Sequence, residues 1–159
     1  GDEFLNAVED TSWTRLVDSI IASQELLDAT ISGNEQAVAQ AIDKAHDEHT
    51  SILSYNDENS LACVLTMAYI WARNEYIIHR EYATGKGYAD LVMIPRRNVN
   101  KPALVIELKF NHSIDTVLDQ IKRKDYPSKI AEYTGDILLV GINYDKDTKQ
   151  HTCKIERMS

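Results

Sequence analysis

The sequence contains only two cysteines among its 159 residues. Cys63 and Cys153 lie far apart and form no CxxC pair. This spacing argues against a disulfide scaffold and against a zinc site, both of which need clustered cysteines. We therefore expect a protein of a reducing compartment, located in the cytoplasm.

Long apolar runs are also missing. No stretch approaches the ~20 apolar residues of a membrane span, and no basic segment is followed by an apolar leader. We therefore expect no membrane partner.

A phosphate-cradling GxxxxGK[ST] loop is absent too, so no ATPase activity belongs to this segment. The chain begins with Gly1 rather than methionine, and we expect a domain excised from a longer chain.

Positive charge is scarce. The sequence has 17 basic and 25 acidic residues, which gives 17 − 25 = −8. This balance argues against a role that rests on bulk attraction to nucleic acid, but it allows a local basic groove. The length suits one compact domain with an adequate core.

The N-terminal third has helical periodicity. Apolar residues from Trp13 to Ile31 recur at helical spacing up to Gly33, and Asn34 is a good N-cap for a second helix. We expect Trp13 to be a core aromatic. A third helix, over about 58–72, is apolar nearly all round and should be buried. We expect an N-terminal helical segment over residues 1–55, packed on a core formed by residues 56–159.

The rest of the chain alternates strands with one helix. The predicted elements are strands at 76–83, 88–95, 103–110, 136–144 and 149–157, and a helix from Ser113 or Asp115 to about Asp125. This order predicts an α/β fold in which helices flank a mixed sheet.

One predicted strand, ALVIELKF at 103–110, carries two charges inside an apolar run. Side chains alternate along a strand, so Leu104, Ile106, Leu108 and Phe110 share one apolar face. Glu107 and Lys109 lie on the other face. Burying charges is costly unless they are paired or bound. The face therefore opens onto a polar site, or the two charges pair internally; an exposed edge strand is the third possibility.

Asp90 lies on the preceding predicted strand. If the two strands form a hairpin, Asp90 approaches Glu107 and Lys109. Two carboxylates make an oxygen-rich site suited to Mg²⁺ or Mn²⁺. The lysine could then orient a water molecule or stabilise charge developing on a phosphate.

The pattern of Asp90, 16 intervening residues and Glu107-Leu-Lys109 resembles the PD-(D/E)XK phosphodiesterase superfamily. The resemblance implies the restriction-endonuclease-like fold: a mixed sheet flanked by helices, here with an N-terminal helical segment. Four stretches are similar to a narrower prokaryotic group in which an ATPase-like domain of the AAA type precedes a nuclease-like domain. They are Asn56–Ser60, Glu81–Asp90, Ile106–Phe110 and Gln120–Tyr126.

The resemblance also implies residue roles. Asp90, Glu107 and the backbone carbonyl of Leu108 would bind the metal, and Lys109 would be the catalytic lysine. Glu58 would add an acidic group, although acidic residues are favoured in a first helical turn by the dipole alone. Substrate would be bound by Gln120, Lys124 and Tyr126.

Together these features predict a Mg²⁺- or Mn²⁺-dependent nuclease that hydrolyses nucleic-acid phosphodiesters, with DNA as the expected substrate. The alternative is a non-catalytic binding or regulatory module attached to an ATPase-like domain in the same parent chain. A structural domain whose first helices dock on a partner is a further possibility. A concave basic patch beside Asp90 would favour the nuclease, and a flat apolar patch would favour docking.

Three other polar clusters have plainer interpretations. Arg96 and Arg97 are expected in a solvated loop with Lys101. The basic run Lys122–Lys124 could follow a phosphate backbone or simply face solvent. His46 to His49 is expected to be a polar helix end, where a cationic histidine suits the dipole.

Overall fold

The structure is a computed structural model that describes residues 2–49, 58–81, 88–123, 133 and 135–158; for residues 2–10, 49, 58–59, 61–62, 81, 88–90 and 123 it describes the backbone alone. Its helices are α1 (Asp2–Ile31), α2 (Glu35–His49), α3 (Glu58–Ala68), the 3-10 helix η1 (Ile70–Asn74) and α4 (Ile114–Arg123). Its strands are β1 (Tyr76–Glu81), β2 (Tyr88–Pro95), β3 (Ala103–Phe110), β4 (Ile137–Asp145) and β5 (Gln150–Arg157).

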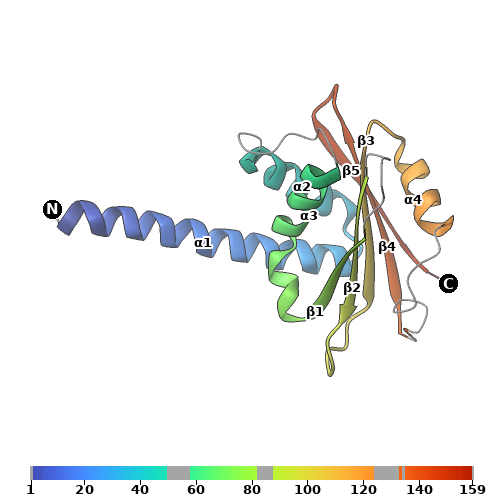
Figure 1. The fold of residues 1–159 in the computed structure, drawn as a ribbon, viewed down its shortest axis with the longest axis horizontal. Helices are drawn as coiled ribbons and strands as arrows, with labels where there is room; N and C mark the ends of the chain where they lie inside the picture. The colour runs from blue at the N-terminus through green and yellow to red at the C-terminus, as the bar shows by residue number, and fades with distance from the viewer. Residues whose placement is uncertain (1, 50–57, 82–87, 124–132, 134, 159) are drawn as a thin grey trace.

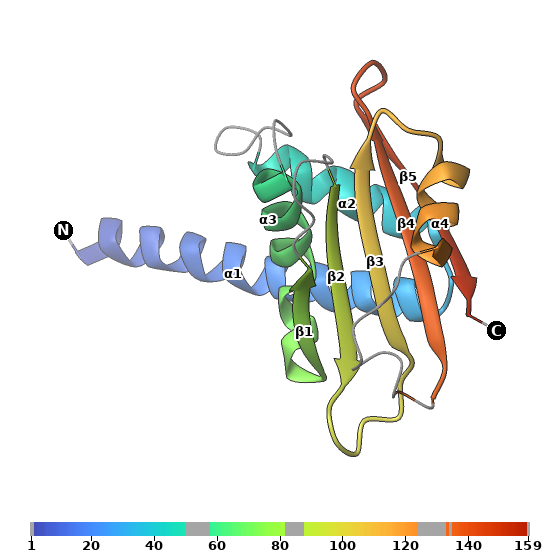
Figure 2. The same ribbon diagram turned by 45° about the vertical axis from the view of Figure 1, so that its right-hand side comes forward.

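The five strands form one sheet in the order β1-β2-β3-β4-β5. β3 and β4 are parallel, and the other neighbouring strands are antiparallel. A parallel pair needs a crossover connection, and α4 lies within it. Figure 1 shows α1, α2 and α3 on one side of the sheet and α4 on the other; Figure 2 shows the strand order. The predicted mixed sheet flanked by helices is confirmed.

The two faces of the sheet bury two apolar clusters. The larger lies under α1, α2 and α3 and includes Leu104, Ile106 and Leu108 from β3. The smaller lies under α4 and includes Ala103 and Val105. The strict alternation along β3 follows from the period of two, because each step along a strand moves a side chain to the opposite face. Glu107 and Lys109 therefore belong to the α4 face.

α2 attaches to β5 at the sheet edge through polar contacts. The N–H of Ile155 donates to Glu35 Oε2 at 2.7 Å, and the N–H of His151 donates to Asp43 Oδ1 at 2.7 Å. The predicted N-cap is confirmed, since the N–H of Ala37 donates to Asn34 Oδ1 at 3.2 Å. These side chains satisfy backbone groups that a helix end or a strand edge would otherwise leave open.

Two expectations about the helical segment are wrong. Trp13 is 67% exposed, because α1 runs on beyond the body and burial begins only near Ser23. His46 is buried rather than placed on a polar helix end. Its ring lies 4.8 Å from the ring of Tyr144, centroid to centroid, because α2 lays this turn against the edge of the sheet.

The third helix ends earlier than predicted. α3 stops at Ala68, and η1 follows, with the N–H of Ala72 bonded to the carbonyl of Tyr69 and that of Glu75 to Ala72. The strands at 88–95 and 103–110 have the predicted bounds. The turn predicted at 84–87 lies outside the described residues.

Among the described residues, the structure contains no helix that is both long enough and apolar enough to cross a membrane.

We predict that Gly141→Val will destabilise the protein by about 1–3 kcal/mol, the usual range for overpacking. A Cβ at this position on β4 would lie 3.4 Å from Val117 Cγ1 and 3.5 Å from the backbone nitrogen of Leu118. Two further methyl groups would therefore push α4 away from the sheet. Urea unfolding measures the effect. Gly141→Ala is the control and should cost little; an equal loss in both variants would contradict the steric explanation.

We predict that stability falls as the pH drops from about 7 to 5. Burial lowers the pKa of His46 and of His151 below the ordinary 6.5, and for His151 it outweighs the opposing effect of the bonded Asp43. Below pH 6.5 the unfolded chain therefore takes up protons that the folded chain does not, which favours unfolding. The groups around His151 are Asp43, His46 and Asp47 of α2 and Tyr144 of β4.

The measurement is the urea midpoint at several pH values. His46→Leu, which removes one buried titrating group, should flatten the dependence. Substitution of the exposed His112 by Gln should leave the slope unchanged. A midpoint that stays constant down to pH 5 in the unmodified protein would refute the prediction.

Candidate active site

The two charges of β3 are buried in the middle of the sheet. Glu107 is 1% exposed and Lys109 is 3% exposed. Lys109 Nζ lies 3.9 Å from Glu107 Oε1, an ion-pair distance that is too long for a direct hydrogen bond. β3 has β2 on one side and β4 on the other, so an exposed edge strand is ruled out.

The strand register aligns three acidic positions across the sheet. Asp90 of β2 is directly opposite Glu107 of β3, and Glu81 of β1 is directly opposite Asp90. Opposite positions of an antiparallel pair lie on the same face of a sheet. The predicted pairing of the strands that carry Asp90 and Glu107 is confirmed. The side chains of Asp90 and Glu81 lie outside the described part of the structure.

The position next to Glu107 on the other side is a glycine. Gly141 of β4 pairs with Glu107 in the parallel register. Without a side chain at this position, the backbone of α4 can approach β4 closely at Leu118. On the side of β4, the position next to Glu107 is therefore covered by α4.

A cavity of about 390 Å³ lies beside Lys109. Its described lining consists of Lys109, His112, Thr116, Asp119 and Gln120. Gln120 was predicted to bind substrate, and the structure places it in this lining with Lys109. Sequence reasoning missed His112, Thr116 and Asp119. Thr116, Asp119 and Gln120 are spaced by three and four residues, which is the spacing of one helix face and could have indicated them.

Asn143 holds the end of β3 in place. It is buried, and the register puts it next to Lys109 on β4. Its Oδ1 accepts a hydrogen bond from the N–H of His112 at 3.0 Å. The chain leaves β3 at Asn111, which has a positive φ of 57°. The buried amide thus fixes the turn that carries His112 to the cavity rim.

Two basic side chains of α4 and β5 are paired with carboxylates. Lys122 pairs with Glu156, and Lys154 Nζ lies 2.7 Å from Asp115 Oδ1. Within the run Lys122–Lys124, which was predicted to follow a phosphate backbone, the charge of Lys122 is therefore offset by Glu156 of β5.

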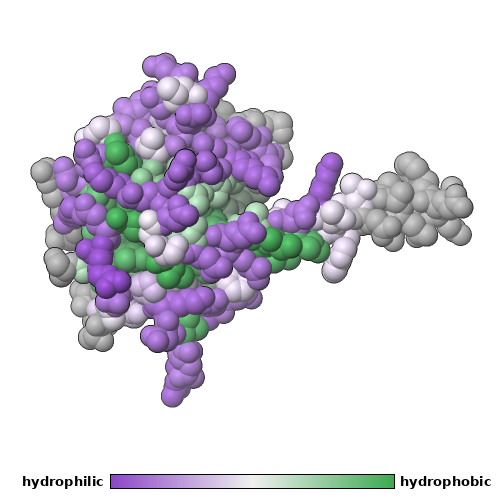
Figure 3. All heavy atoms as spheres, turned by 180° about the vertical axis from the view of Figure 1, so that it is seen from behind, coloured by the Kyte–Doolittle hydropathy of each residue, from purple (hydrophilic) through white to green (hydrophobic). Residues whose placement is uncertain are grey.

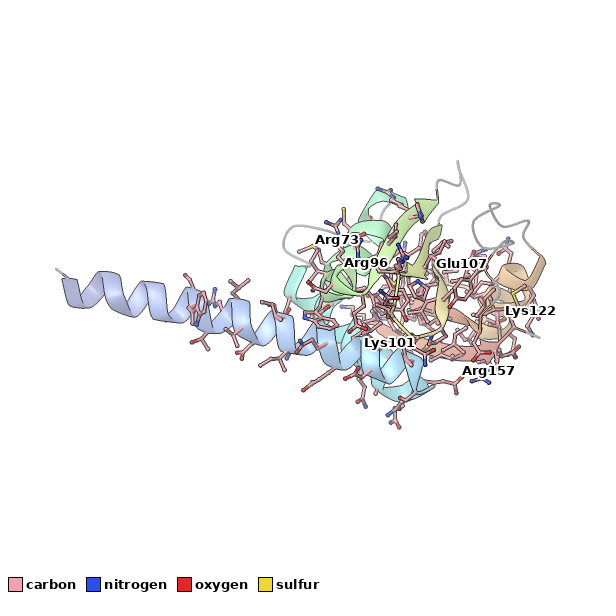
Figure 4. The ribbon with its side chains drawn as sticks, turned by 90° about the horizontal axis from the view of Figure 1, so that it is seen from below. Arg73, Arg96, Lys101, Glu107, Lys122 and Arg157 are labelled. Atoms are coloured by element: carbon pink, nitrogen blue, oxygen red, sulfur yellow. The ribbon has the colours of Figure 1, made fainter. Side chains whose placement is uncertain are left out.

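A second group of basic residues lies where β2 ends. Arg73, Arg96 and Arg97 are exposed, and within the described residues none of the three has an ion-pair partner. Arg96 Nε donates to the carbonyl of Arg73 at 2.9 Å, while Lys101 pairs with Glu75. In Figure 4, Arg73 and Arg96 lie on one side of Glu107, and Lys122 and Arg157 lie on the other. The arginines form a local basic patch on an otherwise acidic chain.

Besides Asp90, three predicted site residues have side chains that the structure does not describe. Glu58 begins α3 as expected, but its side chain lies outside the described part. Lys124 and Tyr126 fall in a range that is not described. Leu108 is buried in the larger apolar cluster, so only its backbone could take part in a site on the α4 face.

The donor types suit a hard divalent cation. Carboxylate oxygens are preferred by Mg²⁺ and Mn²⁺, and the aligned positions 90 and 107 both carry carboxylates. The described side chains contain no group of three His, Cys, Asp or Glu residues able to hold a metal.

Comparison with known families places the chain in a superfamily of enzymes. The model of the PD-(D/E)XK nuclease superfamily matches residues 56–154, well over half of the 159 residues, and the chain belongs to this superfamily. Searches among curated proteins and among solved structures found no match. The fold is accordingly restriction-endonuclease-like, and the domain is nuclease-like. Members of the superfamily generally use divalent metals such as Mg²⁺.

We predict that Lys109→Met will cost about 3–5 kcal/mol of stability, because removing one member of a buried pair leaves the other charge poorly compensated. Adding Glu107→Gln should recover much of that loss. Chemical denaturation of both single variants and the double variant measures the coupling. Lys101→Met is the control; its partner Glu75 is partly exposed, so the loss should stay below about 1 kcal/mol. Equal losses in the Lys109 single and double variants would contradict this prediction.

Proposed function

We propose that this domain is a metal-dependent nuclease that hydrolyses phosphodiester bonds of nucleic acid, with DNA as the substrate. The observation that carries the proposal is the register of Asp90 against Glu107, with Lys109 at a cavity two residues further along β3. Membership of the PD-(D/E)XK nuclease superfamily supports it. Residues 56–159 would form the nuclease core, and residues 1–55 a helical segment packed on it. The domain would act in the cytoplasm.

Asp90, Glu107 and the carbonyl of Leu108 would hold one Mg²⁺ or Mn²⁺ ion. When bound, the ion supplies Lewis acidity and lowers the pKa of a coordinated water molecule. Lys109 would donate hydrogen bonds to a phosphate oxygen or orient the attacking water, and its burial beside Glu107 keeps its ammonium group in a defined position. Glu58 would add a second acidic group near the metal.

Substrate would be held from α4 and the chain that follows it. Gln120 would contact substrate in the cavity beside Lys109, and Lys124 and Tyr126 would extend that contact. An acidic chain needs local sources of affinity for a polyanion. The bound cation and Lys109 would be the nearest source, and the patch of Arg73, Arg96 and Arg97 a more distant one.

The second candidate is a non-catalytic binding or regulatory module attached to an ATPase-like domain in the same parent chain. Two observations favour it: the net charge of −8, and the pairing of Lys122 and Lys154 with acidic neighbours. Both weaken the attraction of a DNA backbone. The two candidates differ in whether the aligned carboxylates bind a cation that DNA strengthens.

We expect Mg²⁺ and Mn²⁺ to bind with a stoichiometry near one in isothermal titration calorimetry, and more tightly when a short DNA duplex is present. The substrate phosphate would complete a site that has few protein ligands. Asp90→Ala should abolish the binding. Asp136→Ala removes an exposed carboxylate just before β4 and serves as the matched control. No heat from either metal, with or without DNA, would refute the catalytic proposal.

Cleavage is the second part of the same test. We expect labelled duplex DNA to be cut with Mn²⁺ or Mg²⁺, and Lys109→Ala to slow cutting by about 10²–10³-fold, as for the loss of one preorganised donor. Single-stranded DNA and RNA are compared in parallel. Metal binding that depends on Asp90 without cleavage of any of the three would favour the regulatory module.

A further inference from the structure

The end of the sheet where β2 stops carries a concentration of positive charge. Residues 73–75 and 96–101 contain four basic residues and one acidic residue, which gives a charge of +3, so the rest of the chain sums to −8 − 3 = −11. Arg73, Arg96 and Arg97 are exposed, and we call these three residues the arginine patch. Figure 3 shows mostly hydrophilic residues at the lower end of the body, where Figure 1 places the loop between β2 and β3. Charge of one sign gathered on one part of a chain attracts ligands of the opposite sign.

Hydrogen bonds hold the backbone under the arginine patch. The N–H of Arg96 donates to the carbonyl of Glu75 at 2.8 Å, which ties the loop after β2 to the residue that follows η1. The N–H of Val99 donates to the carbonyl of Arg96 at 3.0 Å and closes a turn within the loop. Asn98 in this turn has a positive φ of 70°, a conformation in which asparagine is enriched. The patch therefore combines two segments of the chain in a defined relative position.

The side chain of Arg96 is oriented for a bidentate contact. Its Nε donates to the carbonyl of Arg73 at 2.9 Å, and this bond uses one of the five N–H donors of a guanidinium. The two Nη groups carry the other four donors, and no ion pair among the described residues uses them. A planar fork held in this way matches two oxygens of one phosphate. The bond to the carbonyl at the end of η1 accounts for the Nε group, but it leaves the two Nη groups and the exposed Arg97 without a role.

The groups around the arginine patch favour a nucleic-acid backbone over other polyanions. Glu75, the acidic residue of these segments, pairs with Lys101 and not with an arginine. Asn98 and Asn100 are exposed in the loop and add neutral amide donors. Protein groups of both kinds, arginines and amides, are typical contacts of phosphate and sugar oxygens. The chain also belongs to a superfamily of nucleases.

The spacing between the arginine patch and the candidate active site matches a short run of duplex. Arg96 lies six residues after Asp90 along β2, and Lys101 lies six residues before Glu107 along β3. A strand rises about 3.3 Å per residue, so each path is about 20 Å long. A DNA duplex rises about 3.4 Å per base pair and covers this length in about six base pairs. We propose that the arginine patch binds the backbone of a DNA duplex about six base pairs from the phosphate that lies at Lys109.

This binding rests on the proposed function for the position of the scissile phosphate, and it defines the substrate more closely. The substrate would be a duplex with a flank of at least about six base pairs on one side of the cut, because shorter DNA cannot reach both places. Contact between the arginine patch and DNA requires neither a metal nor cleavage. It can therefore be measured separately from the activity at Asp90.

Fluorescence anisotropy without divalent metal tests the arginine patch, with a labelled duplex of about 20 base pairs that exceeds the span between patch and site. We expect the affinity to fall steeply as the salt concentration rises from about 50 to 200 mM. Arg73→Gln and Arg97→Gln should each lower the slope of log K against log salt by about 1. Arg15→Gln removes the same charge from the exposed part of α1, and it should leave the slope unchanged. All three positions are exposed, so circular dichroism should show that the variants are folded.

Calorimetry of cation binding tests whether one duplex reaches both places. The long duplex should strengthen Mg²⁺ or Mn²⁺ binding less in the Arg73→Gln/Arg97→Gln double variant than in the unmodified protein. A dinucleotide has one phosphodiester and cannot span about 20 Å, so it should act equally on the two proteins. Cation binding without DNA should also be equal, because the substituted residues lie away from Asp90 and Glu107.

Unchanged salt slopes in Arg73→Gln and Arg97→Gln would overturn the role of the arginine patch, and so would an equal fall in Arg15→Gln. Absence of DNA binding at about 50 mM salt would overturn it too, and would assign the patch to an acidic protein partner. An equal gain in cation affinity from the long duplex in the unmodified protein and the double variant would overturn the spacing of six base pairs.

The proposed nuclease fails by a different result, which is the absence of any cation binding that depends on Asp90. Lower salt slopes in Arg73→Gln and Arg97→Gln together with that result would support DNA binding by the arginine patch. They would overturn its placement relative to a catalytic site. Unchanged slopes together with cation binding and cleavage would overturn the patch and leave the nuclease in place.

Discussion

The constraint on which the site depends is the burial of Glu107 and Lys109 within a central strand. Charges can stay out of water only if opposite charges, hydrogen bonds or a bound ion compensate for the lost hydration. On β3 they lie two residues apart on one face, with an ion-pair distance of 3.9 Å, while the other face of the strand is wholly apolar. The central position of β3 thus makes the pairing of the two charges necessary, whereas on an exposed strand water would solvate each of them.

α4 packs on the face of the sheet that carries this charged pair and supplies residues to the cavity beside it. Its apolar residues cover Ala103 and Val105, and the glycine at 141 lets its backbone come close to β4. Its polar residues Thr116, Asp119 and Gln120 then line the cavity next to Lys109. α4 therefore covers the site at β4, and its polar residues line the cavity beside Lys109. Chemistry and packing use opposite faces of the same ten residues.

Charge is distributed unevenly for a nuclease-like domain. The net charge is −8, and two lysines near α4 are paired with carboxylates, whereas three arginines at the far end of β2 have no described carboxylate partner. Long-range attraction of a polyanion would thus be weak, and binding would rest on short-range contacts at the site. The exposed apolar residues of α1, among them Trp13 and Leu16, form a second surface of a different kind. A nuclease would be favoured by a basic patch beside Asp90, but these three arginines lie at the far end of β2, whereas the exposed apolar residues of α1 suit docking.

The sequence by itself determined the elements and the family. Apolar runs bounded by turn signals predicted the bounds of β2 and β3, Asn34 marked the start of α2, and the spacing of Asp90, Glu107 and Lys109 identified the superfamily. These are local signals, set by backbone geometry and side-chain polarity within a few residues.

Only the tertiary structure decided which residues share a site and which helix surface stays bare. His112 and Asn143 lie on different segments and meet because β3 and β4 are parallel neighbours. Trp13 and His46 show the same limit: periodicity predicted an apolar helix face and a polar helix end. Whether another element covers the Trp13 and His46 side chains depends on where the sheet ends. The residue pattern within a single helix does not contain that information.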